Sequence, residues 1–463
     1  MLNLFSPGDG RRFDRREMLK IGGLTVGGVG LPQLLAAQAQ GASPRRGDGF
    51  GRAKNCIILY LSGGNPQHDM YDPKPDTPAE IRGEFSTIAT STPTVRFGEH
   101  CRQSAKIMDR LALVRSMYHD HSDHARGSYQ MFTGTEYAGS VPDANSMSRQ
   151  DMPHLGSVVA KLAPGQGPMF PFVLVPHRMD VAGGRRVGQF AGMLGSKFDP
   201  MLTAGNPNDD DFRLRHLPLQ PNEQPAAFRR RLGLLEQLNG QTEYLQEQPA
   251  AQSLTQAQTK ALEVISSKQV RQAVDLASID PAQREFYGRN LFGQSVLLGR
   301  RLLEAGSRLV QCNWQRTQGI NGFAWDTHWN NFSALKDDLI PPFDQAFYAL
   351  ITDLEKTGQL DETLVVQAAE FGRSPKVTLK NGGREHWPQV YTVAFAGAGI
   401  CGGQVYGASD KQGAFPAESP VTPADFVATI YHFLGIDPKQ ETHDQLNRPF
   451  QLSKGSPIPL EVV

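Results

Sequence analysis

The chain has 463 residues, which is enough for one large α/β domain with insertions or for two domains. Lys plus Arg and Asp plus Glu both number 47, and this neutral balance gives no support to a role in binding nucleic acid or another polyanion. The four cysteines form no CxxC pair, so we expect buried free thiols rather than a disulfide scaffold at Cys56, Cys101, Cys312 and Cys401.

The N-terminal residues have the pattern of an export signal. The motif RREMLK at 15–20 is typical of a twin-arginine signal, and an apolar, glycine-rich stretch at 21–35 is followed by small residues at 37–39. The apolar stretch is too short to favour a membrane-spanning helix, and an ordinary amphipathic helix is the alternative. We therefore predict a signal peptide at 1–39 that binds the twin-arginine translocase, a flexible leader at 40–52, and a periplasmic or extracellular protein with no stable membrane span.

Continuous apolar runs that end in glycine or polar residues predict strands buried on both faces of a parallel sheet. Amphipathic spacing predicts helices between them, the first at 125–132 with Ser122 or Asp123 as its cap. The strands are expected at 56–61, 111–115, 172–175, 309–312, 363–369 and 391–396, and the other helices at 224–238, 255–272, 281–305, 333–357 and 423–434.

Strands that alternate with helices indicate an α/β fold with a mainly parallel central sheet and helices on both faces. We expect this domain to extend over 53–445. A stretch at about 200–305, polar and rich in glutamine in its first part, is interpreted as a helical insertion, and 446–463 as a C-terminal tail. The insertion could cover the site or form a separate helical appendage.

His, Asp and Glu side chains gather where the predicted strands end. The carboxyl ends of parallel strands meet at one edge of a sheet, so residues far apart in the sequence can converge there. Mixed sets of imidazole and carboxylate groups suit divalent ions such as Zn²⁺, Mn²⁺, Ca²⁺ or Mg²⁺. A single histidine is more often a surface or hydrogen-bonded residue, but the clustering favours a metal site. The candidate ligands are Asp69, Asp326, His328, Glu370 and His386 first, followed by His68, His121 and His124.

Further candidate roles concern chemistry beside that site. Ser122 is the candidate nucleophile, although the His-x-x-His pattern around it fits a pair of ligands equally well. His124 is a candidate for catalysis as well as for metal binding. Arg373 and Arg384 could bind an anionic substrate group through the guanidinium fork, or could neutralise nearby carboxylates. His119 could orient a neighbouring ligand.

Four motifs, in order along the chain, cover nearly all of it after the predicted signal peptide. They are GGNPQHDMYDPKP at 63–75, HDHSDHARGSYQMFTG at 119–134, WDTHWNNF at 325–332 and AAEFGR at 368–373. Together they resemble the exported bacterial family known as domain of unknown function 1501, which is grouped by fold with the alkaline phosphatase and sulfatase superfamily. The resemblance implies an alkaline phosphatase-like three-layer sandwich.

Shorter segments resemble the sulfatases themselves. LVVQAAEFGR at 364–373 is similar to their strand that ends in ligands, with Glu370 at the carboxylate position and a phenylalanine in place of the histidine. His386 resembles the later histidine ligand, and VTPADFVATIYHFLGI at 421–436 resembles the superfamily's late helix. The Cys-x-Pro-Ser-Arg motif that yields the sulfatase nucleophile is absent, and His124 falls near its position.

These observations predict an exported metal-dependent hydrolase of phosphate or sulfate esters, with a small-molecule or glycan ester as substrate. The alternative is a non-catalytic, metal-containing binding or assembly protein of the cell envelope, which the missing nucleophile motif favours. A mutase-type isomerase or transferase is a third reading, but its usual substrates are cytoplasmic metabolites, and the export signal argues against it.

Overall fold

The computed structural model describes most of the chain after residue 48. The chain divides into two units, Met1–Asp48 and Gly49–Val463, and in the first of them β1 (Thr25–Val26) pairs antiparallel with β2 (Val29–Gly30). Apart from these strands, the predicted signal peptide, most of the leader and the predicted helix at 224–238 lie outside the described residues. The described residues of the second unit are 49–139, 147–181, 184–185, 187–214, 260, 263–315, 325–378 and 381–463.

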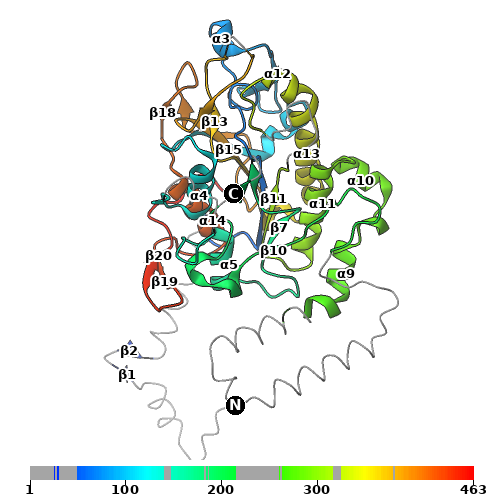
Figure 1. Ribbon diagram of the computed structural model, residues 1–463, viewed down its shortest axis with the longest axis vertical. Coiled ribbons are helices and arrows are strands. Elements are labelled where there is room, and N and C mark those ends of the chain that lie inside the picture. Colours follow the sequence, from blue (N-terminus) through cyan, green and yellow to red (C-terminus); the bar gives the residue numbers. More distant parts are fainter. Residues whose placement is uncertain are drawn as a thin grey trace, which may run out of the picture. The chain divides into compact units, whose positions relative to one another are not determined.

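The second unit is built on a sheet of eight strands in the order β10-β7-β11-β3-β12-β15-β6-β16 (Figure 1). β15 runs antiparallel to both of its neighbours, and the other strands run in one direction. Ile57 of β3 lies opposite Val310 of β11 and Val365 of β12, so apolar rows match across the sheet. The strands are β3 (Asn55–Tyr60), β6 (Leu111–Met117), β7 (Phe172–Val175), β10 (Met201–Leu202), β11 (Leu309–Asn313), β12 (Thr363–Ala368), β15 (Tyr391–Ala396) and β16 (Gln404–Tyr406).

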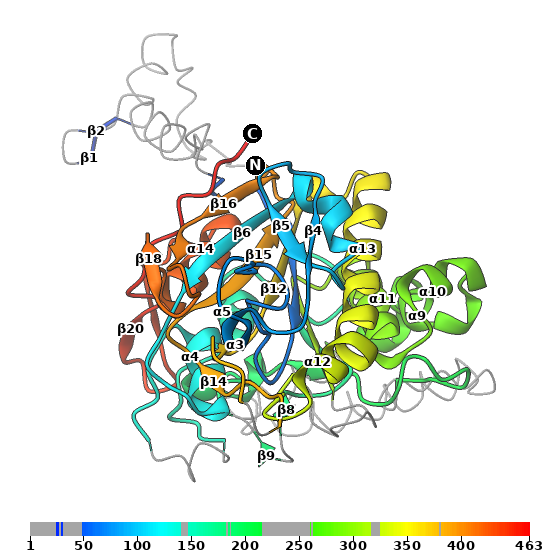
Figure 2. The ribbon, with the colours of Figure 1, turned by 90° about the horizontal axis from the view of Figure 1, so that it is seen from above.

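Two apolar cores lie on the two faces of the sheet because side chains alternate along each strand. Ile57 and Leu59 belong to the core that α11 and α13 cover, whereas Cys56 and Ile58 belong to the core beneath α4, α5 and α14. Figures 1 and 2 show these helices on opposite sides of the sheet, which makes a three-layer sandwich. The covering helices are α4 (His124–Thr133), α5 (Leu155–Leu162), α11 (Leu291–Glu304), α13 (Ile340–Lys356) and α14 (Pro423–Phe433).

Shorter elements decorate the edges of this sandwich. Five antiparallel hairpins are described: β4 (Thr87–Ala89) with β5 (Arg96–Gly98), β8 (Asp180–Val181) with β9 (Gly184–Arg185), β13 (Gly372–Arg373) with β14 (His386–Trp387), β17 (Ala408–Ser409) with β18 (Pro416–Glu418), and β19 (Glu441–His443) with β20 (Pro449–Gln451). The short helices are α3 (Ala79–Arg82), α9 (Lys268–Val274), α10 (Pro281–Tyr287) and α12 (Asn331–Ala334). Among the described residues, no helix has both the length and the apolar character needed to cross a bilayer.

The predicted fold class is confirmed, and all six predicted strands are present. The predicted helix after residue 122 is α4, and Asp123 is its N-cap, accepting a hydrogen bond from the Arg126 backbone N–H at 2.9 Å. The predicted helix at 281–305 is two helices, α10 and α11. The chain turns between them at Gly288, which has a φ of 93°.

Three boundaries differ from the sequence prediction. α11 packs on β11 and α13, so this part of the expected insertion belongs to a helical layer of the sandwich. The helix predicted at 333–357 starts earlier, as α12, and passes through a π-helical turn at Leu335–Leu339 before α13. The expected tail joins the body, since β20 pairs with β19 and both Ile458 and Leu460 are buried.

Candidate metal centre

Asp326 lies at the centre of a group of three histidines. Its Oδ1 is 2.9 Å from His386 Nε2 and 3.0 Å from His328 Nε2, and its Oδ2 is 3.2 Å from His124 Nε2. The Nε2 atoms of His328 and His386 are 2.9 Å apart. The ligand atoms of His124, Asp326 and His386 all lie within 4.8 Å of one another. We call these four residues the histidine–aspartate centre.

The fold brings three separate segments together to form this centre. His124 is the first residue of α4, which follows β6; Asp326 and His328 follow β11; and His386 lies in β14, beyond β12. These strands all end at the same edge of the sheet, as predicted from their parallel direction. A tight turn after β3 completes the wall at Gly63, which has a φ of 120°; a Cβ atom there would lie 2.4 Å from the Asp326 backbone nitrogen.

Each histidine of the centre is held through its Nδ1 atom by an oxygen that can only accept. A carbonyl or ionised carboxylate oxygen has no proton to give, so each ring donates from Nδ1. Each Nε2 faces the Asp326 carboxylate, which also can only accept, so a ring either carries a second proton on Nε2 or offers that nitrogen to a cation. The Nε2 of His124 is buried and lies 3.2 Å from Asp326 Oδ2. The three acceptors are Glu370 Oε1 for His124 at 2.7 Å, Glu385 Oε2 for His328 at 2.5 Å, and the Ser122 backbone oxygen for His386 at 2.6 Å.

Glu370 is a fully buried carboxylate that holds His124 rather than a fifth member of the centre. It accepts hydrogen bonds from the Tyr60 hydroxyl and the Gly63 backbone N–H, both at 2.8 Å, as well as from His124. Burial raises the pKa of Glu370, but these hydrogen bonds outweigh burial and lower it below its ordinary value. Glu370 is therefore an anion that fixes both the tautomer and the orientation of the His124 ring.

Arg373 is also fully buried, and its guanidinium holds Asp326 in place. It donates to the backbone oxygens of Gly63, Gly64 and Arg384 as well as to the Asp326 carboxylate. Since Arg373 has no exposed surface and these four bonds involve Nε and both Nη atoms, it is not positioned to fork around an anionic substrate.

Charge in the centre is balanced around Asp326. Burial opposes ionisation of Asp326, but hydrogen bonds from the three histidines and the charge of Arg373 outweigh it, so its pKa is held far below the usual range. Burial lowers the pKa of His124, yet its bonds to Asp326 and Glu370 prevail and raise it; the bond to Asp326 likewise raises the pKa of His328. Burial keeps the pKa of His386 below its ordinary value. Without an ion, the centre therefore attracts protons.

Three of the predicted ligands are not brought to the centre. Asp69 forms a fully buried pair with Arg384, whose Nε lies 2.9 Å from Asp69 Oδ2. His68 Nε2 donates to the Gln412 backbone oxygen at 2.7 Å. His121 Nε2 lies 3.1 Å from Glu136 Oε1.

Two other candidate residues make supporting contacts beside the centre. The Ser122 side chain is exposed, and its backbone oxygen supports His386. His119 donates from Nε2 to the Glu370 backbone oxygen at 2.6 Å and so holds the segment that carries Glu370.

Two supporting residues were missed from the sequence, Tyr60 and Glu385. Tyr60 ends β3 with its ring in the core, so nothing in the apolar run distinguished it from a packing residue. Glu385 directly precedes the candidate ligand His386, and a carboxylate beside a ligand was the one signal that could have identified it.

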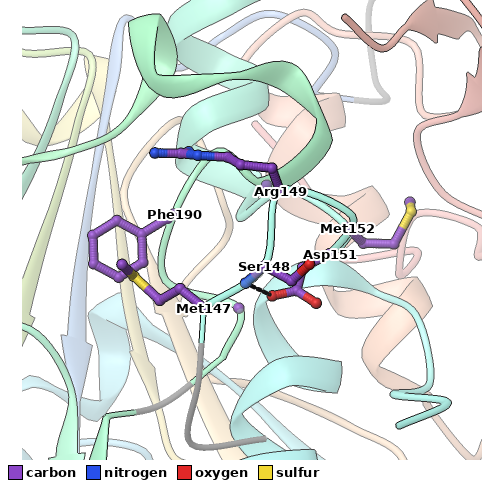
Figure 3. A pocket seen from close by; sticks show the side chains of 8 residues that line it. Met147, Ser148, Arg149, Asp151, Met152 and Phe190 are labelled. Atoms are coloured by element: carbon purple, nitrogen blue, oxygen red, sulfur yellow. Dashed lines mark hydrogen bonds between the residues drawn. The ribbon is translucent and has the colours of Figure 1, made fainter. Parts of the chain in front are cut away.

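Figure 3 shows a small cavity elsewhere in the molecule. It has a volume of about 80 Å³ and is lined by two methionines, a phenylalanine, Arg149 and Asp151; in the figure the Asp151 carboxylate accepts a bond from Ser148, which is 2.9 Å long. No histidine lines this cavity, and the histidine–aspartate centre takes no part in it.

The arrangement of the centre fits a divalent cation. Three imidazole nitrogens and one carboxylate oxygen make the four-ligand set typical of zinc sites, and each imidazole has the supporting acceptor that such ligands usually have. The side chains of Asp326, His328 and His386 are 12%, 25% and 20% exposed, so the centre is reachable from solvent. Buried Glu370 and Arg373 close its inner side.

Solved structures with a similar chain path include two hydrolases and a synthase. Sulfatase PsFucS1 from Pseudoalteromonas sp. is 12% identical, with 91% of this chain and 72% of that chain covered at a TM-score of 0.37. Lipoteichoic acid synthase LtaP from Listeria monocytogenes is 12% identical, with 90% of this chain and 79% of that chain covered at a TM-score of 0.36. Phosphonate monoester hydrolase SpPMH from Silicibacter pomeroyi is also 12% identical, with 82% of this chain and 73% of that chain covered at a TM-score of 0.36. All three are remote, and nothing about activity follows from them.

Family membership is a stronger finding than these likenesses. No curated protein matches the chain by sequence. The family described as "Protein of unknown function (DUF1501)" matches residues 53–461, which is most of the chain and includes every residue of the histidine–aspartate centre. The chain belongs to the DUF1501 family.

Proposed function

We propose that this chain is an exported, metal-dependent hydrolase of phosphate or sulfate esters, in which His124, Asp326, His328 and His386 hold one divalent ion. The observation that carries the proposal is the convergence of three imidazole Nε2 atoms on one carboxylate, each imidazole fixed through Nδ1 by its own acceptor.

The composition of the centre narrows the choice of ion. Ca²⁺ and Mg²⁺ prefer sets of oxygen ligands, whereas imidazole suits Zn²⁺ and other transition metals. Three nitrogens against one oxygen therefore favour Zn²⁺, with Mn²⁺ second, among the four ions considered.

The residues around the centre suit hydrolysis of an ester. A bound divalent ion would supply Lewis acidity toward an ester oxygen and would lower the pKa of a water molecule. Glu370 keeps His124 in one tautomer, and Arg373 keeps Asp326 ionised and in place. Ser122, whose exposed hydroxyl lies on the loop that supports His386, is the candidate nucleophile of the chain itself.

The proposed site of action is outside the cytoplasm. The motif RREMLK at 15–20 supports export by the twin-arginine translocase, and a protein folded before export can carry its ion with it. Esters outside the cytoplasm include those on glycans, which we propose as the substrate class beside small-molecule esters.

A non-catalytic binding protein of the cell envelope is the second candidate. One observation favours it: Arg373, which contacts the carboxylate of the centre, is fully buried and also donates to three backbone oxygens, so it presents no exposed donor to a phosphate or sulfate group.

Elemental analysis of the full chain, purified without chelator, tests the proposal. We expect one equivalent of zinc or manganese in the wild type and none in an Asp326→Ala/His328→Ala variant. A His121→Ala/Glu136→Ala variant is the matched control, because it removes a histidine–carboxylate pair that lies outside the centre, and it should keep its ion. Folded protein with no ion in any of the three would end the metal-site proposal.

Turnover is tested next, on a panel of phosphate and sulfate esters with the metal-loaded protein. Hydrolysis that is lost in Asp326→Ala/His328→Ala but kept in the control establishes the enzyme. Loss of hydrolysis in a Ser122→Ala variant that still binds its ion is the result expected if Ser122 is the nucleophile. A stoichiometric ion with no turnover on any ester would leave the binding protein as the better account.

A further inference from the structure

Glu385 differs from the other two acceptors that hold the centre's histidines. The acceptor for His124 is the fully buried Glu370, and the acceptor for His386 is a backbone oxygen. The Glu385 side chain is 57% exposed, yet its Oε2 lies 2.5 Å from His328 Nδ1. A solvated carboxylate usually gains little from holding one geometry, so this contact calls for an explanation.

The backbone beside Glu385 is fixed independently of its side chain. Its N–H donates to Ser374 Oγ at 2.9 Å, and its backbone oxygen accepts from the Ser374 N–H at 2.8 Å. The preceding Arg384 N–H donates to the Thr327 backbone oxygen at 3.0 Å, directly before His328. The carboxylate is therefore presented to the His328 ring by segments that are hydrogen-bonded to one another through their backbones.

His328 is the ligand that most needs such support. The ligand atoms of His124, Asp326 and His386 all lie within 4.8 Å of one another, and this group does not include His328. The His328 side chain is also the most exposed of the four, at 25%, against 10%, 12% and 20% for the others. Without a partner at Nδ1, its ring can rotate into solvent and leave three ligands.

We propose that Glu385 is a positioning residue, which aims His328 Nε2 at the ion and thereby converts a three-ligand group into a four-ligand centre. The inference rests on the proposed metal centre and deepens it. Glu385 itself contributes no atom to the ion. Its effect is on the affinity and the coordination number of the bound metal.

A pair of the same chemistry outside the centre provides a matched control. His121 Nε2 lies 3.1 Å from Glu136 Oε1, and the Glu136 side chain is 70% exposed. Removal of either exposed glutamate changes the net charge equally, but only Glu385 contacts a ring of the centre.

The test compares zinc affinity and cobalt spectra for the full chain and its Glu385→Ala, Glu385→Gln and Glu136→Ala variants. Competition with a chromophoric chelator should show zinc bound roughly 10- to 100-fold more weakly by Glu385→Ala, the usual effect of losing such a support. Glu385→Gln, whose amide oxygen can still accept from Nδ1, should lie between Glu385→Ala and wild type. Glu136→Ala should match wild type.

The visible spectrum of the Co²⁺-loaded protein reports coordination directly. We expect Glu385→Ala to change the d–d bands relative to wild type and Glu136→Ala to leave them unchanged. Equal affinity and identical spectra in Glu385→Ala and wild type would overturn the role of Glu385 while leaving the metal centre intact. A wild type that binds neither ion would overturn the centre itself. Unfolding curves recorded in chelator show whether Glu385→Ala folds. If it does not fold, zinc affinity and the cobalt spectrum are compared between Glu385→Gln and wild type instead.

Discussion

At the scale of single residues, the centre is poised between binding protons and binding a cation. With every Nδ1 protonated, the Nε2 lone pairs of His328 and His386 face each other at 2.9 Å, which is unfavourable unless something positive lies between or beside them. A second proton on one ring relieves the repulsion, and so does a divalent ion. The raised pKa values of His124 and His328 correspond to the first alternative, in which a ring takes up a second proton.

Competition between protons and the metal ion for the imidazole nitrogens predicts how metal binding depends on pH. Hydrogen bonding to Asp326 raises the pKa of His328, and bonds to Asp326 and Glu370 raise that of His124 despite burial, so both rings keep a second proton above the ordinary imidazole value of about 6.5. Bound metal requires both rings to be neutral. The apparent zinc affinity should therefore rise as pH rises through these raised values, by up to about tenfold per pH unit for each proton lost, and level off above them.

Zinc titrations at a series of pH values between about 5.5 and 8.5 check this dependence. Asp326 adds nothing to the slope, because its pKa is lowered and it stays ionised over the whole range. The His121→Ala variant should show the wild-type slope. An affinity that does not change over this range would contradict the idea that the rings of the centre release protons when the metal binds.

At the scale of elements, the hairpin of β13 and β14 carries Arg373, Glu385 and His386 to the centre. A buried ion pair anchors it: Arg384 forks Asp69 through Nε and Nη2, at 2.9 and 3.1 Å. Arg384 also donates to the backbone oxygens of Ser374 and Ile81. Asp69, proposed from the sequence as a ligand, thus acts on the centre through the hairpin.

Removal of Asp69 separates this anchoring role from a ligand role. Asp69→Ala leaves the buried Arg384 guanidinium without its counter-charge, so we expect the free energy of unfolding to fall by about 3–5 kcal/mol in urea denaturation. Folded Asp69→Ala protein should still bind one equivalent of zinc at saturation, unlike Asp326→Ala. Lys54→Ala, which breaks the exposed pair of Lys54 with Glu362, should not change stability measurably. Loss of zinc without loss of stability would restore Asp69 as a ligand.

The strands of the sheet were predictable from the sequence. The contacts of the site residues could be predicted only in part. Apolar runs such as 363–369 mark strands buried on both faces, and parallel strands must end at one edge, which is why Asp326, His328 and His386 could be placed together in advance. The loop after β3 ends at the same edge, but it turns Asp69 toward Arg384. That pairing spans 315 positions and follows no periodic pattern.

At the scale of the whole molecule, the centre joins segments that the chain brings in from different parts of the sandwich. His124 begins a helix on one face of the sheet, Asp326 and His328 follow β11, and His386 comes from the hairpin beyond β12. An ion bound by all four would link these segments directly. It would therefore stabilise the entire unit Gly49–Val463 and not only one loop.

This linkage predicts a metal-dependent stability of the folded chain. A ligand that binds the folded state alone stabilises it by about 2.7 kcal/mol at a free concentration of 100 times its Kd, which for a unit of this size raises the Tm by a few degrees. Thermal melts of the full chain should thus shift upward with zinc and downward with a chelator, and the shift should grow with the zinc concentration. Asp326→Ala should melt at one temperature in zinc and in chelator, since it loses the carboxylate on which all three rings converge, whereas the His121→Ala/Glu136→Ala control should keep the wild-type shift. A zinc shift of equal size in Asp326→Ala and wild type would mean that the stabilising ion binds elsewhere in the chain, and the histidine–aspartate centre would then be a network of protonated imidazoles around a carboxylate.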